Sequence, residues 1–306
     1  MFDLTAVTGL AVLAVSFIGG ICGGVWGIGA HWIIGPPLLV LGVPAPLVVG
    51  CSTVHMAAKS LYPVWRDRRE LDWAPGGAGR TIALPMALGS ALTVFAGVQA
   101  LAWAKARGLA PEVVGVSYGV LLAAIVGYGL YGRFRGAGRR ERLAGPLGMA
   151  VSALVGLGAG VFAGFLGIGG GLVRRPALAY LIRTEERHTG PIGQFTVLVS
   201  SVVAAVLHGG QQNVQWDLAA LLCVGGIVGQ AIGNAGRRPL LAAGRAEVPE
   251  TAYLAAAAGL LVSQVLGLVG WQTAGRVLVI LLGVGVCLYL VLEVLAAKKA
   301  LKARSA

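Results

Sequence analysis

Long apolar runs, separated by short polar stretches, make up most of the chain. Several of them, such as residues 4–21, 147–166 and 277–295, are long enough to cross the roughly 30 Å hydrocarbon core of a bilayer as a helix. The pattern predicts an all-α polytopic membrane protein. We expect helical segments at 4–24, 32–41, 45–65, 80–100 and 113–131 in the first half, and at 147–166, 172–182, 191–208, 218–235, 251–269 and 275–296 in the second.

The two short segments, 32–41 and 172–182, decide the number of spans. We expect each either to cross obliquely or to form a half-helix sheltered by the protein. If both count as spans, the chain has eleven, starts outside and ends in the cytoplasm, with nearly all basic loops inside, as the positive-inside rule favours. If both are re-entrant, nine spans remain and the basic tail after residue 297 lies outside. The prediction is therefore 9–11 transmembrane segments.

The composition agrees with a membrane location. Of the 306 residues, 57% are hydrophobic and 12% are charged, against about 25% charged in soluble domains. The net charge of +12 comes mostly from short loops, which indicates membrane orientation and argues against a nucleic-acid partner. The four Cys residues lack metal-ligand spacing, and no cofactor, catalytic or P-loop motif occurs. We therefore expect no metal, no cofactor and no enzyme activity.

An internal repeat relates the two halves. Matching positions recur at an offset of 140 or 143 residues: 27–29 with 167–169, Pro36 with Pro176, and Trp73 with Trp216. The first half contains an odd number of segments, so the second half enters the membrane from the opposite side. This predicts two inverted-topology repeats, 1–135 and 143–306, the second with an added C-terminal helix, in a single membrane domain.

Each half carries a Gly-rich helix break near the same point. The first break contains Gly27 and Gly29 and is followed by His31, and the second contains Gly169, Gly170 and Gly171. Such breaks leave backbone amides and carbonyls unpaired, and paired breaks in two repeats indicate a transporter's binding site. The alternative is close helix packing through Gly.

Polar side chains near the breaks are further candidates. Arg174 and Arg175 follow the second break, where a guanidinium would either meet an anion or extend to the membrane interface. Segment 45–65 carries a polar stripe, expected to face the bundle interior, with Lys59 extending towards Arg66. The members of the stripe and its neighbours are Cys51, Ser52, Thr53, His55 and Lys59, and the matched segment 191–208 retains Gln194 and Thr196.

These motifs recur as a set. In each half a Gly-rich stretch precedes a Pro-containing apolar stretch, a segment that starts with Gly, and a motif that ends in Trp, at 27–36, 50–52 and 71–73 and again at 167–176, 193–196 and 214–216. Over about residues 10–290, this set resembles the sulfite exporter TauE/SafE family, also called the toluene sulfonate uptake permease family. The resemblance implies a transporter of the bacterial inner membrane for sulfur-containing anions such as sulfite, sulfonates or thiosulfate. His31, Arg174 and Arg175 depart from the family pattern.

We therefore expect a secondary transporter that binds its anion near the midplane, between the two breaks. The expected binding residues are Gly27, Gly29, His31, Ser52, Thr53, His55, Gly169, Gly170, Gly171, Arg174, Arg175, Gln194 and Thr196. The alternatives are a channel-like anion facilitator, a sulfur-relay membrane protein that uses Cys51, and a partner subunit without a pathway of its own. The expected partners are the anion and the lipid bilayer, and a homodimer is left open.

Overall fold

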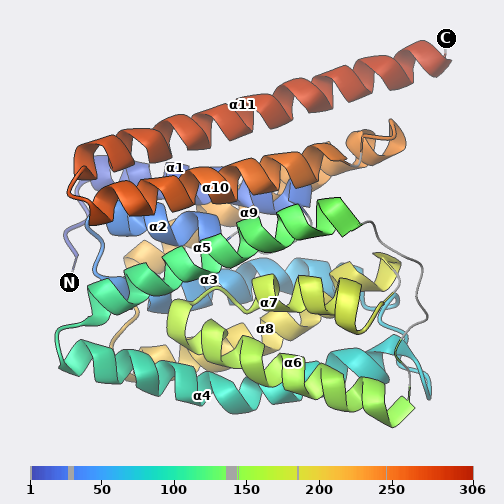
Figure 1. Ribbon diagram of the computed structural model, residues 1–306, viewed down its shortest axis with the longest axis horizontal. Helices are drawn as coiled ribbons and strands as arrows, with labels where there is room; N and C mark the ends of the chain where they lie inside the picture. Colours follow the sequence, from blue (N-terminus) through green and yellow to red (C-terminus); the bar gives the residue numbers. More distant parts are fainter. Residues whose placement is uncertain are drawn as a thin grey trace. The chain divides into compact units, whose positions relative to one another are not determined.

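The computed structural model describes residues 2–26, 31–135, 143, 145–184, 186–245 and 247–305. All regular structure in these residues is helical (Figure 1). The first half contains α1 (Ala6–Trp26), α2 (His31–Val40), α3 (Ala45–Arg66), the π-helical turn η1 (Gly79–Ala83), α4 (Leu84–Ala106) and α5 (Ala110–Arg135). The second contains α6 (Gly145–Leu166), α7 (Gly171–Pro176), the π-helical turn η2 (Ala177–Leu181), α8 (Glu186–Gly210), α9 (Trp216–Ala242), α10 (Glu247–Leu268) and α11 (Gln272–Ser305). Each predicted segment corresponds to one of these helices.

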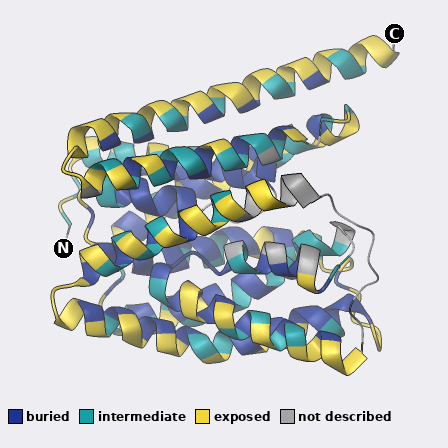
Figure 2. Ribbon diagram, viewed as in Figure 1, coloured by how far each residue is buried: buried dark blue, intermediate teal, exposed yellow. Residues whose placement is uncertain are grey.

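Eight helices of the described chain are long and apolar enough to span a membrane: α1, α4 with its leading turn η1, α5, α6, α8, α9, α10 and α11. α3 is a ninth long helix, with 22 residues and Lys59 in its interior. Exposed side chains recur along α4 and α11 in Figure 2, and the large ones, including Leu88, Phe95, Leu281 and Leu288, are apolar. Helices with apolar outer faces are typical of membrane spans.

The two short helices are half-length elements. α2 has 10 residues, and α7 with η2 covers residues 171–181. At about 1.5 Å of rise per residue, either one covers about half of the hydrocarbon core. This matches the half-helix form that the sequence allowed for these segments.

Contacts divide the chain into two compact units. The first unit comprises Met1–Asp3, Val43–Val114 and Gly138–Cys223, and so contains α3, α4, α6, α7 and α8. Within it α6 packs along α4, as Figure 1 shows, and α8 packs along α3. The second unit comprises Leu4–Gly42, Gly115–Ala137 and Val224–Ala306, with α1, α2, α10, α11 and most of α5 and α9. Each unit thus takes helices from both halves of the sequence.

Glycines bring α4 and α6 into backbone contact in the first unit. A Cβ atom added at Gly156, Gly160 or Gly164 would lie 2.2 Å from a carbonyl oxygen of α4. Across the same contact, the Ser90 hydroxyl donates to the Gly156 carbonyl (2.9 Å) and the Thr93 hydroxyl to the Leu157 carbonyl (2.6 Å). Small residues in this spacing allow membrane helices to pack closely.

The same kind of contact joins α1 and α9 in the second unit. A Cβ atom added at Gly20 or Gly24 of α1 would lie 2.5 Å from the carbonyl oxygen of Gly226 or Gln230. Gly229 of α9 faces α1 in return, and a Cβ atom there would lie 2.2 Å from the Phe17 carbonyl oxygen. No room therefore remains for a side chain on either face.

The two glycine contacts share one register. Gly20 and Gly24 of α1 correspond to Gly160 and Gly164 of α6, at the offset of 140 residues that also relates the two breaks. Their contact partners correspond as well, because Gly226 and Gln230 follow Ser90 and Val94 by 136 residues (226 − 90 and 230 − 94). In each unit the first helix of one half therefore packs on the fourth long segment of the other half. This correspondence supports an internal repeat, and the inverted orientation of the halves stays a prediction.

Candidate functional site

The second helix break is a tight, fully packed turn between α6 and α7. Gly167, Gly169 and Gly170 have φ values of 69°, 63° and 65°, in the left-handed region that favours glycine. A Cβ atom at Gly167 would lie 2.5 Å from the Val49 carbonyl oxygen, and one at Gly169 would lie 2.8 Å from the Met56 side chain. The break therefore requires glycine for both its conformation and its contact with α3.

Arg174 lies in α7, one turn beyond the break, and its side chain is 1% exposed. The guanidinium folds back, so that Nη1 donates to the carbonyl oxygen of Gly169. Nη2 donates to the hydroxyl oxygens of Ser90 in α4 (2.7 Å) and Ser200 in α8 (3.1 Å). One buried cation thus joins the break to two long helices.

The serine hydroxyls are oriented to accept these hydrogen bonds. Ser90 donates its own proton to the Gly156 carbonyl at 2.9 Å, and Ser200 donates to the Thr196 carbonyl at 2.9 Å. Their lone pairs are therefore left for the guanidinium, since a hydroxyl has one donor and two acceptor positions.

Arg174 has no acidic partner in the helices that surround it. α3, α4, α6 and α7 contain no Asp or Glu, and α8 contains one only at its first residue, Glu186. All printed acceptors of the guanidinium are neutral, and Nε has no hydrogen-bond partner among the described residues. A buried charge without a counter-charge is costly, and an arginine remains protonated in proteins. The arrangement therefore suits a negatively charged ligand.

The other predicted hydroxyls are buried and bonded within their own helices. Ser52 donates to the Val48 carbonyl, Thr53 to the Gly50 carbonyl (2.7 Å) and Thr196 to the Ile192 carbonyl (2.9 Å). Their oxygens keep acceptor positions but have no free proton to offer an anion. His55 is also buried, in the interior of α3, as the polar stripe predicted.

Gln194 and Gly171 are less enclosed. Gln194 is half-buried, and its Oε1 atom has no hydrogen-bond partner among the described residues. Gly171 is the first residue of α7, and a Cβ atom there would meet nothing within 4 Å. All described candidates, with Gly169, Gly170 and Arg174, belong to the first unit.

Four predicted residues lie wholly or partly outside the described residues. Gly27 and Gly29 of the first break are among residues 27–30, which the structure does not describe. His31 begins α2 and Arg175 lies in α7, but the side chains of both are outside the described set. A shared site between the two breaks therefore stays a prediction.

Three residues have a place that the sequence did not indicate. Ser90 and Ser200 were not among the expected site residues, although they bind Arg174. Lys59 was expected to extend towards Arg66, and this was wrong, because its side chain is 4% exposed and enclosed by the first unit. A cation in an apolar helix was the only signal for this burial, and it could not indicate the depth.

Cys51 is part of a backbone contact. Its thiol donates to the Gln215 carbonyl oxygen (3.4 Å) and accepts from the Gln215 amide (3.3 Å). The neighbouring Gly50 has no room for a side chain, because a Cβ atom would lie 1.9 Å from the Asn213 carbonyl oxygen. The thiol is fully buried, which favours a packing role over sulfur chemistry.

Apolar helices, broken by glycine and enclosing an arginine, define a multi-pass membrane protein with the features of a solute transporter. The family model for the sulfite exporter TauE/SafE matches residues 12–240, well over half of the chain. The chain belongs to this family of membrane transporters, as the motif set indicated. Searches of curated proteins and of solved structures returned no match.

Proposed function

We propose that this protein carries small sulfur-containing anions, such as sulfite, sulfonates or thiosulfate, across a bacterial inner membrane, and that Arg174 binds the anion. The family supplies the substrate class. The observation that carries the site is a guanidinium with 1% exposure, three neutral acceptors and no carboxylate in the surrounding helices beyond the first residue of α8.

The chemistry of the guanidinium fits an oxyanion. Arginine presents several N–H donors in one plane, which matches the geometry of oxyanion oxygens and gives charge-assisted hydrogen bonds. Its Nε–H is still available, and Gly169 next to it lies in the break, where backbone irregularity is tolerated inside a protein. The bound anion would neutralise a charge that the protein leaves unpaired.

The matching glycine contacts support a transport mechanism based on two repeats. If the halves run in opposite directions, each contact is one hinge side of an alternating-access cycle, with the anion site carried by the broken helices. In this account the C-terminus, with its basic residues, is cytoplasmic.

A ligand panel on the purified protein tests the substrate class. Sulfite, thiosulfate, methanesulfonate, acetate and chloride are added at equal ionic strength, and the melting temperature is recorded. A ligand that binds only the folded state stabilises it by about 2.7 kcal/mol at 100 times its Kd. We expect the sulfur oxyanions to raise the melting temperature more than acetate or chloride does, and Arg174→Gln to remove the difference. Equal shifts for all five anions would contradict the proposal.

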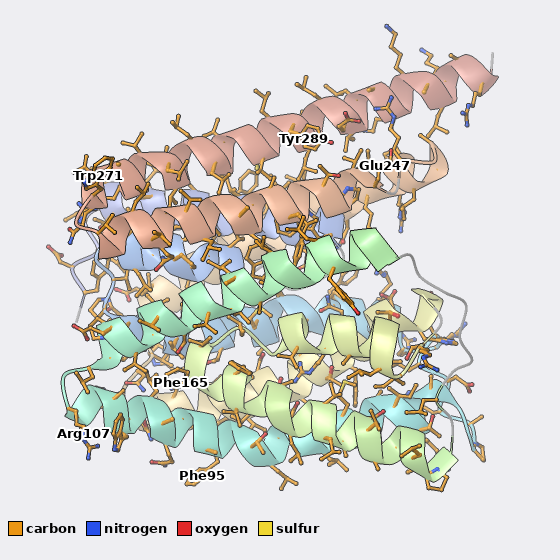
Figure 3. The ribbon with its side chains drawn as sticks, viewed as in Figure 1. Phe95, Arg107, Phe165, Glu247, Trp271 and Tyr289 are labelled. Atoms are coloured by element: carbon orange, nitrogen blue, oxygen red, sulfur yellow. The ribbon has the colours of Figure 1, made fainter. Side chains whose placement is uncertain are left out.

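The matched control is Arg107→Gln. Arg107 lies just beyond the end of α4 (Figure 3) and its guanidinium is 4.1 Å from the centre of the Trp103 ring. This substitution removes the same charge at an exposed position of the same unit, so the ligand shifts should persist.

A further inference from the structure

Three aromatic side chains form a closed cluster in the second unit. Trp26 is the last residue of α1, Trp32 is the second residue of α2, and Tyr253 belongs to α10. The two indole rings are stacked, with centroids 5.5 Å apart and planes 17° apart. Tyr253 meets both edge-on, at 5.3 Å from Trp26 and 4.9 Å from Trp32.

Both indole N–H groups of this cluster lack an acceptor. Trp26 is 2% exposed and Trp32 is 0% exposed, and neither Nε1 atom has a hydrogen-bond partner among the described residues. A buried Trp usually finds a partner for its N–H, and a buried unpaired donor calls for an explanation such as a bound ligand. Here two such donors are side by side.

The geometry decides which ligand chemistry fits. An aromatic cage for a cation presents free ring faces, but these faces are covered by each other and by Tyr253. The edges remain, and the indole N–H is a donor only. The cluster therefore suits a hydrogen-bond acceptor, and two converging donors suit an oxyanion oxygen.

We infer that Trp26 and Trp32 form a second, uncharged contact for the transported anion and donate their indole N–H groups to its oxygens. This inference rests on the proposed function, since it takes the ligand to be the same sulfur oxyanion. Neutral donors hold an anion less tightly than the Arg174 guanidinium. A weaker contact suits transport, because an ion that crosses must also be released.

The direct test uses the protein with ¹⁵N-labelled tryptophan. The chain has seven Trp residues, so seven indole N–H signals are expected. Sulfite should shift two of them in the direction of hydrogen bonding, and the two should be the signals lost in Trp26→Phe and Trp32→Phe. Tetramethylammonium chloride, a cation with the shape that aromatic cages prefer, should shift neither. Two Trp26 and Trp32 signals that ignore sulfite, or that respond to the cation instead, would overturn the inference.

Binding measurements on a variant without the N–H complete the test. Benzothienylalanine at position 32 keeps the ring shape and replaces the N–H by sulfur, so the cluster should fold even where Phe disturbs it. We expect the Kd for sulfite to rise about tenfold, the effect of one lost hydrogen bond to a charged acceptor. The same replacement at Trp271, which is 66% exposed at the α10–α11 connection (Figure 3), should leave the Kd unchanged.

The two proposals fail in different ways. If the unmodified protein binds no sulfur oxyanion, the proposed function is wrong. If the unmodified protein and the Trp271 variant bind sulfite, and the position-32 variant binds it equally well, only the inference about the indoles is wrong.

Discussion

The Arg174 guanidinium and the Ser90 hydroxyl, 84 residues apart in sequence, are joined by a 2.7 Å hydrogen bond inside the first unit. Ser90 also bonds to Gly156 in α6, so this single hydroxyl connects α4, α6 and α7. The position of the arginine is thus set by helix packing through glycine, and the packing and the candidate site depend on each other.

Removing a serine that holds Arg174 should weaken both folding and anion binding. Ser200→Ala leaves a guanidinium N–H without its acceptor, which costs about 1–3 kcal/mol of stability for a buried group. The adjacent Ser201 is the matched control, since its buried hydroxyl has no hydrogen-bond partner among the described residues. Chemical denaturation and sulfite titration of Ser200→Ala and Ser201→Ala check this. Equal effects of the two substitutions would contradict the arrangement.

Glycine substitutions in α6 should have opposite effects at two nearby positions. A Cβ atom at Gly160 would lie 2.2 Å from the Ser90 carbonyl oxygen, so Gly160→Ala forces the backbones apart and should destabilise by about 1–3 kcal/mol. Gly158 has open space, so Gly158→Ala should stabilise by up to about 1 kcal/mol through helix propensity. Melting temperatures measure both.

The same test in the second unit uses Gly229→Ala, where the added Cβ would lie 2.2 Å from the Phe17 carbonyl oxygen. We expect a loss like that of Gly160→Ala, because the two contacts share one register. A neutral Gly229→Ala would count against the repeat.

A chain of polar groups ties the end of α8 to α6 just before the break. His208 Nε2 is bonded to the Gly164 carbonyl (2.8 Å), Asn213 Nδ2 to His208 Nδ1 (3.2 Å), and Lys105 Nζ donates to Asn213 Oδ1 (2.8 Å). Asn213→Leu leaves the buried imidazole nitrogen unpaired and should cost about 1–3 kcal/mol. Lys105→Met removes only the exposed end and should cost less than about 1 kcal/mol. Denaturation curves that reverse this order would contradict the chain of bonds.

The membrane topology can be tested by labelling single cysteines in a protein without its four native Cys residues. With eleven spans, a cysteine at Arg68 or Lys299 is cytoplasmic and one at Arg107 is external. An impermeant maleimide added to intact cells should therefore label only position 107. Labelling at 299 without permeabilisation would indicate nine spans instead.

Helix positions could be predicted because hydrophobic runs mark them directly. The segment predicted at 45–65 is α3 (Ala45–Arg66), and the one at 172–182 is α7 with η2. Errors occur where a helix continues past its apolar run, as α11 does through the basic tail to Ser305. Basic residues near a helix C-terminus are favourable, so the helix does not end where hydrophobicity ends.

The surroundings of Arg174 could not be predicted, because they depend on contacts between distant segments. Ser90 and Ser200 are small polar residues in apolar helices, and nothing in their local sequence separates them from Ser201. The exchange of helices between the two halves was also invisible, although the glycines at 20, 24, 160 and 164 carried its register. Glycine spacing shows that a helix packs closely but does not name the partner.

The most direct test of the central claim is sulfite flux into liposomes that contain the purified protein. We expect saturable flux in the unmodified protein and in Arg107→Gln, and a fall of about tenfold or more in Arg174→Gln and Arg174→Lys, since each loses charge-assisted hydrogen bonds of the guanidinium. Flux that stays linear with concentration would indicate a channel-like facilitator. Saturable sulfite flux of normal rate in folded Arg174→Gln protein would contradict the account.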